Sequence, residues 1–260
     1  MSIPKTIHYC WFGRNPKPKL AKKCIKSWKK HCPEYEIIEW NEDNFDISSC
    51  PLYVRQAYEA QKWAFVTDYV RLKVIYDNGG IYLDTDVQLI KSLDGLLKFD
   101  AYFGFEDGNH ISTGLGFGAI KNNPIVQEIM DDYNDINFIL ADGTYDLLPC
   151  PVRNTNIFLR HGLIQNNTFQ IINNCAVLPS DYLCPIEYET GKKNITDNTL
   201  SIHHFSASWQ AKEVKKQHEG EIKRIKHNNL VHDIKHFPNF IMKKIMGNDN
   251  YNKLKGKLKK

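Results

Sequence analysis

Apolar positions along the chain recur with two different spacings, and the order of these spacings predicts the fold. Residues 3–12 form an apolar and aromatic run that ends at Gly13 and predicts a first strand. Residues 20–30 follow with apolar positions at helical spacing, and residues 35–40 alternate like a second strand. The segment 54–76 is helical again, and its apolar belt is so broad that we expect burial on most faces.

Predicted strands and helices continue along the chain up to residue 205. The predicted helix stops at Asn78-Gly79-Gly80, and residues 80–87 predict a strand. Further segments predict strands at 101–105, 115–120, 169–172, 177–179 and 201–205, and a helix at 125–133. Because strands alternate with helices, we expect an α/β fold with a mostly parallel, three-layer sheet. Ligands of such sheets bind at the carboxyl ends of the strands.

Two carboxylates, Asp84 and Asp86, end the predicted strand 80–87. Side chains at i and i+2 of a strand point to the same face, so we expect the two carboxylates to form a cluster of oxygen ligands. Hard divalent cations that carry phosphate prefer such a site. A lone Asp-x-Asp occurs by chance in many proteins. The alternative to a metal or phosphate site is that the two aspartates simply form a turn. The preceding helix, Gly-Gly break and apolar strand favour a metal or phosphate role here.

A second charged pair, Asp68 and Arg71, lies on the preceding helix. The two residues are three positions apart, so they share a helix face. An exposed intrahelical ion pair is the structural alternative, and it would contribute little. The neighbouring positions are apolar on nearly every side, and a buried charged pair is costly unless it meets a polar site. We therefore expect this pair to lie beside the acidic strand.

Length and cysteine content narrow the class of protein. The 260 residues fit one large α/β domain or two small ones. No apolar stretch approaches the roughly 18–20 residues that span a bilayer, and the N-terminus lacks the apolar core of a signal peptide, so we expect a cytoplasmic protein. The seven cysteines have no Cys-x-x-Cys spacing, which predicts reduced structural thiols and no zinc site.

The net charge of +4 is unevenly distributed along the chain. Residues 211–260 hold 14 Lys/Arg against 5 Asp/Glu, whereas residues 1–210 hold 20 against 25. We expect a catalytic domain over residues 1–210 and a basic helical extension over residues 211–260. The extension is either a solvated ending or a contact with the anionic inner face of the cytoplasmic membrane. The chain contains no basic motif interleaved with aromatic residues, so we do not expect it to bind nucleic acid.

Three segments together resemble one enzyme family. Residues 67–86, Thr-Asp-Tyr-Val-Arg through Leu-Asp-Thr-Asp, resemble the core block of the sugar-binding-region glycosyltransferases. That group includes bacterial capsular and lipopolysaccharide sugar transferases and yeast initiating α-mannosyltransferases, and it is distantly similar to clostridial toxin glucosyltransferase domains. Residues 3–13 resemble the family's opening strand and residues 201–209 its closing motif, so the resemblance covers roughly residues 3–210.

The resemblance implies a Rossmann-like GT-A fold, a nucleotide-sugar donor, dependence on Mn²⁺ or Mg²⁺, and retention of anomeric configuration. It implies that Asp86 ligates the metal and that Asp84 is shared between metal and donor sugar. Asp68 and Arg71 would hold the transferred sugar and the diphosphate. The implied donor-binding residues are Tyr9, Cys10, Trp11, Asp68, Arg71, Tyr82, Asp84 and Trp209.

Some of the implied roles have a structural alternative. A histidine in a late strand is usually a satisfied core or surface group, but one from the closing motif would complete the metal shell. We favour His203 together with Ser206, and His204 stays an alternative. Trp209 would shield the diphosphate or pack as a core side chain. Asn109, in the polar loop 106–114, would contact sugar and acceptor, unless that loop is simply solvated.

The sequence therefore predicts a metal-dependent, retaining transferase of a hexose or N-acetylhexosamine. We expect a UDP-sugar donor, a glycan or lipid-linked saccharide acceptor, and a role in bacterial capsule or lipopolysaccharide synthesis. The expected catalytic residues are Asp68, Arg71, Asp84 and Asn109, and the expected metal ligands are Asp84, Asp86, His203 and Ser206. The alternatives are a nucleotidyltransferase or other metal-dependent phosphate-handling enzyme, and a catalytically silent nucleotide-sugar-binding module.

Overall fold

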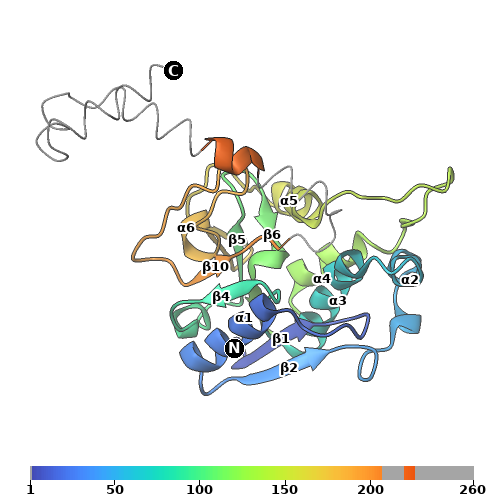
Figure 1. Ribbon diagram of the computed structural model, residues 1–260, viewed down its shortest axis with the longest axis horizontal. Helices are drawn as coiled ribbons and strands as arrows, with labels where there is room; N and C mark the ends of the chain where they lie inside the picture. Colours follow the sequence, from blue (N-terminus) through green and yellow to red (C-terminus); the bar gives the residue numbers. More distant parts are fainter. Residues whose placement is uncertain (1, 207–219, 226–260) are drawn as a thin grey trace, which may run out of the picture. The chain divides into compact units, whose positions relative to one another are not determined.

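The computed structural model describes residues 2–206 and 220–225 of the chain (Figure 1). Residues 2–187 and 192–206 lie in one compact unit, which holds all the named strands and helices. Residues 188–191 and 220–225 belong to a second unit, in which residues 220–225 are helical. Within these described ranges, no helix has the length and apolar content needed to cross a bilayer.

A mixed eight-stranded sheet forms the centre of the described part of the first unit. Its order is β2-β1-β3-β7-β5-β9-β8, with β6 paired to β5. The strands are β1 (Thr6–Cys10), β2 (Glu36–Trp40), β3 (Gly80–Tyr82), β5 (Ala101–Phe105), β6 (Ile111–Ser112), β7 (Phe117–Ala119), β8 (Gln170–Ile172) and β9 (Cys175–Leu178). Strands β1, β2, β3, β5 and β9 run in one direction and the others run against them. The expected mostly parallel sheet is confirmed.

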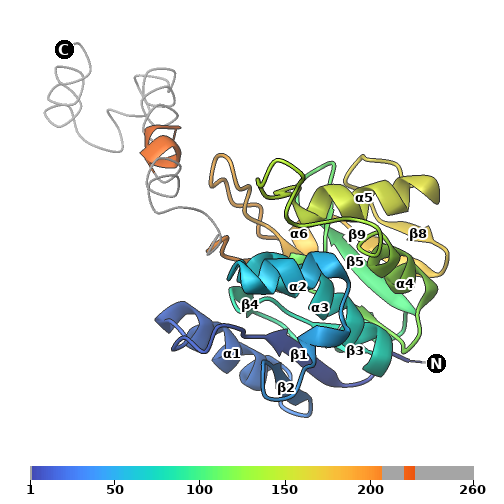
Figure 2. The ribbon, with the colours of Figure 1, turned by 90° about the vertical axis from the view of Figure 1, so that its right-hand side faces the viewer.

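Helices cover both faces of this sheet (Figures 1 and 2). One apolar cluster joins a face of the sheet to α2 (Leu52–Glu59), α3 (Trp63–Asn78), α4 (Pro124–Asp131) and α5 (Cys150–Arg160). The other joins the opposite face to α1 (Lys19–His31), α6 (Ser180–Leu183) and a small sheet of β4 (Val87–Leu89) and β10 (Ser201–His203). Three short 3-10 helices are η1 (Ile47–Ser49), η2 (Asp94–Leu96) and η3 (Thr113–Leu115). The predicted three-layer α/β class is confirmed.

Period-two alternation explains which side chains reach the α3 face of the sheet. Ile7, Tyr9 and Ile81 point into the cluster under α1, whereas Cys10 and Tyr82 belong to the cluster under α3. Strands β1 and β3 are parallel neighbours, with Ile7 opposite Ile81. Their carboxyl ends therefore bring Cys10 and Tyr82 to the same edge, next to the charged pair on α3.

The predicted strand over residues 80–87 is wrong in a way that matters for the acidic pair. Strand β3 ends at Tyr82, and β4 begins at Val87 in the small sheet, where it pairs with β10. The Val87 N–H donates to the Asp84 carbonyl at 2.9 Å and closes a turn between the two strands. The two aspartates thus lie on a turn between sheets and not on one face of a single strand.

Other elements also differ from the sequence pattern. The predicted helix 54–76 is two helices, α2 and α3, because Gln61 has a left-handed backbone (φ 56°) and the Lys62 N–H bonds to the Ala57 carbonyl at 2.8 Å. The continuous apolar belt concealed this break, since residues before and after it are both buried. The loop 106–114 contains the short strand β6, which the sequence did not predict.

Candidate active site

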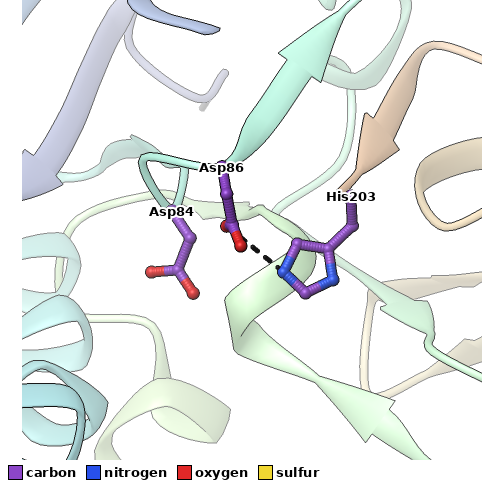
Figure 3. A group of neighbouring side chains, drawn as sticks. All are labelled: Asp84, Asp86 and His203. Carbon is purple, nitrogen blue, oxygen red and sulfur yellow. Dashed lines mark ion pairs between the residues drawn. The ribbon is translucent and has the colours of Figure 1, made fainter. Parts of the chain in front are cut away.

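Asp84, Asp86 and His203 meet at the junction of the two sheets (Figure 3). One ligand atom from each residue lies within 4.8 Å of the others. Asp86 Oδ1 and His203 Nε2 are 3.3 Å apart, and both side chains are mostly buried. Two carboxylates and an imidazole are a donor set that can hold a divalent cation.

The pairing of β4 with β10 brings the histidine to the acidic turn. His203 lies opposite Val87 in this antiparallel ladder, one residue beyond Asp86. The chain then turns back over Asp86: the Ser206 N–H donates to Asp86 Oδ2 at 2.7 Å, and the His204 N–H donates to the Asp86 carbonyl at 3.1 Å. One backbone hydrogen bond therefore holds Oδ2 of the Asp86 carboxylate, while the His203 imidazole lies next to Oδ1.

The structure separates the two adjacent histidines. His203 faces the carboxylates, whereas His204 Nε2 lies 3.0 Å from Gln88 Oε1, away from them. The geometry therefore favours His203 over His204 as the third metal-ligating side chain. Ser206 contacts Asp86 through its backbone, and its role as a ligand stays a prediction.

The two aspartates have different electrostatic surroundings. Burial alone would raise the pKa of Asp86, but the charge of His203 and hydrogen bonds from His203 and Ser206 hold it below its ordinary range. Burial raises the pKa of Asp84 above its ordinary value, and Arg71 only partly offsets this effect. The ion pair with Asp86 outweighs burial and raises the pKa of His203. These opposite shifts of pKa favour a protonated imidazole beside an ionised Asp86.

Arg71 joins the charged pair of α3 to the acidic turn. Its Nη2 donates to Asp68 Oδ1 at 2.6 Å and its Nε donates to the Thr67 carbonyl at 3.0 Å. Its Nη1 lies 3.7 Å from Asp84 Oδ2 and has no hydrogen-bond partner among the described residues, although it is buried. Asp68 and Arg71 therefore lie beside the acidic pair, as expected. The buried Nη1 of Arg71 can still donate a hydrogen bond to a ligand.

Tyr82 and Cys10 border this group from the sheet. The Tyr82 hydroxyl donates to Asp84 Oδ1 at 2.8 Å, and the Arg71 guanidinium lies 5.3 Å from the centre of its ring. The Cys10 thiol is close enough for Arg71, Asp84 and Tyr82 to influence its pKa, but burial dominates and raises that pKa to about 12. The Cys10 side chain therefore lines the site as a neutral thiol and does not act as a nucleophile.

Other predicted residues are engaged elsewhere. The Tyr9 hydroxyl donates to Glu39 Oε2 at 2.5 Å, and Trp11 Nε1 donates to the Asn15 carbonyl at 2.6 Å. Asn109 is exposed at the tip of a turn, where its N–H bonds to Asp107 Oδ1 at 2.7 Å. Trp209 lies outside the described residues. The donor or acceptor roles of Tyr9, Trp11, Asn109 and Trp209 stay predictions.

Two residues of the site were missed by the sequence reasoning. A Cβ on Gly114 would lie 2.9 Å from Asp84 Oδ2 and 3.1 Å from Arg71 Nη1, so only glycine leaves both groups in place. Cys150, the first residue of α5, hydrogen-bonds to the Asp68 carboxylate. Gly114 is the last residue of the polar loop 106–114, and a glycine at that position could have indicated a close approach to the site. The residues around Cys150 contain no comparable signal in the sequence.

Comparison with known proteins identifies a related sequence segment that contains the charged pair of α3 and the acidic turn. Residues 18–103 match the family model described as glycosyltransferase sugar-binding region containing DXD motif. This segment holds Asp68, Arg71, Asp84 and Asp86, and the predicted relationship to the sugar-binding-region glycosyltransferases is confirmed over it.

The chain is also similar to two curated proteins of Schizosaccharomyces pombe. It is 30% identical over 133 residues to inositol phosphoceramide mannosyltransferase 3, which covers 50% of this chain and 36% of the relative. It is 26% identical over 137 residues to inositol phosphoceramide mannosyltransferase 2, with 50% and 38% covered. The chain thus spans little more than a third of the length of the curated relatives it matches.

Solved structures show more distant similarity. The PaToxG glycosyltransferase superposes with a TM-score of 0.46 at 20% identity, covering 61% of this chain and 70% of that one. A glycosyltransferase involved in the glycosylation of the major capsid of PBCV-1 gives a TM-score of 0.45 at 13% identity, covering 82% and 98%.

Proposed function

We propose that this chain is a metal-dependent glycosyltransferase that moves a hexose or N-acetylhexosamine from a nucleotide sugar to a saccharide acceptor. The observation that carries the proposal is the approach of Asp84, Asp86 and His203 to within 4.8 Å of one another, with the buried Arg71 beside them. The match to a sugar-binding region supports sugar transfer over nucleotidyl transfer.

The residues present fit a divalent cation. Asp86, Asp84 and His203 would hold it, and Ser206 would complete the protein's share of the ligands. The mixed oxygen and nitrogen set favours Mn²⁺ over Mg²⁺, which prefers oxygen ligands alone. When bound, the cation would neutralise charge that develops on the diphosphate leaving group.

Arg71 would supply a second positive charge to the diphosphate. Asp68 and the Thr67 carbonyl fix two of its nitrogens, so the guanidinium is held before a ligand arrives. The remaining Nη1 is a buried donor that lacks a hydrogen-bond partner among the described residues and lies 3.7 Å from Asp84 Oδ2. A diphosphate oxygen that accepts from this Nη1–H would satisfy it.

Asp84 would orient the donor sugar. Its Oδ1 accepts a hydrogen bond from the Tyr82 hydroxyl, which fixes the carboxylate while leaving Oδ2 toward Arg71. Such a carboxylate can accept hydrogen bonds from ribose or sugar hydroxyls.

We further propose retention of configuration by front-face attack, in which the leaving phosphate takes the acceptor proton. Asp68 is the carboxylate that would otherwise serve as a nucleophile, but Arg71 and Cys150 already occupy it. In the front-face route the glycosidic bond to phosphate breaks as the acceptor oxygen forms its bond on the same face, so no enzymic nucleophile is needed. Trapping of a covalent glycosyl group on Asp68 would contradict this route.

We propose UDP-sugars as the first donors to test, with GDP-mannose next because the curated relatives are named as mannosyltransferases. Their names also include a ceramide lipid, which supports a lipid-linked acceptor over a free glycan. We propose bacterial capsule or lipopolysaccharide synthesis, on the cytoplasmic side of the membrane, as the setting. The basic extension proposed to contact that membrane falls mostly outside the described residues.

The test is metal-dependent hydrolysis of a panel of UDP-hexoses, UDP-N-acetylhexosamines and GDP-mannose. Asp86→Asn should lower the Mn²⁺-dependent rate by about 100-fold or more, because it removes a charged metal ligand. Asp77→Asn is the matched control, since Asp77 pairs with Lys73 on the exposed side of α3 and should leave the rate unchanged.

A direct measurement of Mn²⁺ binding by electron paramagnetic resonance separates lost binding from lost folding. Both variants should keep the circular dichroism spectrum of the parent. Equal turnover by the Asp86→Asn variant and the parent would refute the assignment. Mn²⁺ and nucleotide-sugar binding without any turnover would instead identify a silent binding module.

A further inference from the structure

Helix α1 presents an array of lysines that the proposed transfer reaction does not use. Its inner face is buried through Ala21, Cys24 and Trp28. Its outer face carries six exposed lysines and no acidic residue: Lys19, Lys22, Lys23, Lys26, Lys29 and Lys30. Because these positions recur every three or four residues, the ammonium groups form one continuous basic surface.

This positive charge is concentrated and is not neutralised by ion pairs. Residues 1–33 hold nine Lys/Arg and no Asp/Glu, whereas residues 34–210 hold 11 against 25. Among the residues that the structure describes, no salt bridge involves a lysine of α1. The first unit is therefore strongly polarised, with its positive end at this helix.

The requirements of helix formation do not explain these lysines. Lys29 and Lys30 in the last turn complement the helix dipole, but Lys19, Lys22 and Lys23 oppose it at the other end. Like charges at this spacing also destabilise a helix. The helix is held instead by its inner side, where Trp28 Nε1 donates to the Val87 carbonyl at 2.7 Å.

The basic surface continues into a groove beside the candidate active site. The groove has a volume of about 710 Å³ and lies between α1 and β4, which are side by side in Figure 1. Strand β4 begins one residue after Asp86, and Ser27 Oγ accepts from the Leu89 N–H at 2.9 Å. The groove is lined by Lys23, Lys26, Ser27, Lys29, Lys30, His31, Gln88, Leu89 and Ile90.

We propose that the lysine face of α1, four of whose six lysines also line the groove, docks this chain onto the surface of an anionic lipid bilayer. All six cations are exposed lysines, with no arginine and no buried cation among them. Flexible, fully hydrated charges suit many lipid phosphates at once, whereas a discrete anion site would use buried or bidentate donors. Docking through α1 would hold β4, and hence the acidic turn that precedes it, near the surface that carries lipid-linked acceptors.

The experiment is co-sedimentation of the full chain with vesicles of phosphatidylcholine alone or with about 30 mol% phosphatidylglycerol. The parent should bind the anionic vesicles at about 0.05 M salt and lose most binding at about 0.3 M. The triple variant K23Q/K26Q/K30Q should bind about 100-fold more weakly, because each lysine near the surface contributes separately. The matched control K62Q/K98Q/K121Q removes the same charge from exposed lysines elsewhere and should change binding less than about threefold.

Several outcomes would overturn the proposal. An equal loss in both triple variants would show that net charge or the basic extension, and not α1, drives binding. Equal binding to neutral vesicles would exclude an electrostatic contact, and lysine-dependent binding to duplex DNA without binding to anionic vesicles would make the partner a nucleic acid. Donor hydrolysis in solution should be unchanged in K23Q/K26Q/K30Q, so a failure of the proposed transfer reaction would be seen separately.

Discussion

At the scale of single residues, neighbours decide what each carboxylate can do. Asp86 is kept ionised by His203 and by the Ser206 N–H, which suits a permanent metal ligand. Asp84 has a raised pKa and hydrogen-bonds to Tyr82, which suits a group that exchanges hydrogen bonds with a sugar. Two aspartates one residue apart thus acquire separate roles from their surroundings and not from their spacing.

Gly114→Ala should lower donor hydrolysis by about 10- to 100-fold with little loss of stability. The new Cβ would lie 2.9 Å from Asp84 Oδ2 and 3.1 Å from Arg71 Nη1, so the ends of these two side chains must shift while the surrounding backbone stays in place. Steady-state hydrolysis and urea unfolding measure the two effects. Gly108→Ala in the same loop is the control, since its Cβ meets nothing within 4 Å. Equal activity of the two variants would show that this close approach is unimportant.

At the scale of elements, the site depends on the chain leaving one sheet for another. Strand β3, an inner strand of the central sheet, ends at Tyr82, the acidic turn follows, and β4 pairs with β10 in the small sheet. Strand β1 is fixed in turn by His8, which accepts from Trp40 Nε1 of β2 at 3.0 Å and donates Nε2–H to the Gly79 carbonyl after α3 at 3.1 Å. These contacts join three elements around the strand that precedes the site.

His8 should make stability fall as the pH is lowered from 6.5 toward 4. Burial lowers the folded-state pKa of His8 from 6.5 to about 4, so between these values the unfolded chain binds a proton that the folded chain does not. The contribution is complete above pH 6.5 and amounts to about 3 kcal/mol, which is lost as the pH falls through about 4. Urea unfolding at several pH values measures it. His8→Gln should be less stable at neutral pH but should show a shallower decline, and an unchanged decline would contradict the assignment.

At the scale of the whole molecule, the charge distribution and the candidate metal site determine how the protein responds to ions in solution. The first unit has a basic end at α1 and an acidic remainder, and its candidate metal site contains a raised-pKa histidine. A protein of this kind should respond to both ionic strength and divalent cations.

Mn²⁺ should raise the melting temperature, and its affinity should increase with pH. His203 is protonated in the metal-free fold because Asp86 raises its pKa, so the metal must displace a proton. Affinity therefore rises with pH until that pKa is passed. At about 100 times the dissociation constant, Mn²⁺ stabilises the fold by about 2.7 kcal/mol, and EDTA should reverse the effect. Calorimetry in two buffers would detect the released proton. An Asp86→Asn variant that is stabilised equally would place the metal elsewhere.

The sequence by itself determined the parts of the site that are local in the chain. Asp68 and Arg71 share a face through helical spacing, and the Gly-Gly break followed by two aspartates marked the segment that the family match also covers. Only the tertiary structure decided that His203 and not His204 faces Asp86, that Gly114 borders Asp84, and that the acidic turn lies between two sheets. The physical reason is that strand register and close approach arise from pairing between distant segments, here β4 with β10, and such pairing leaves no periodic signal in either segment.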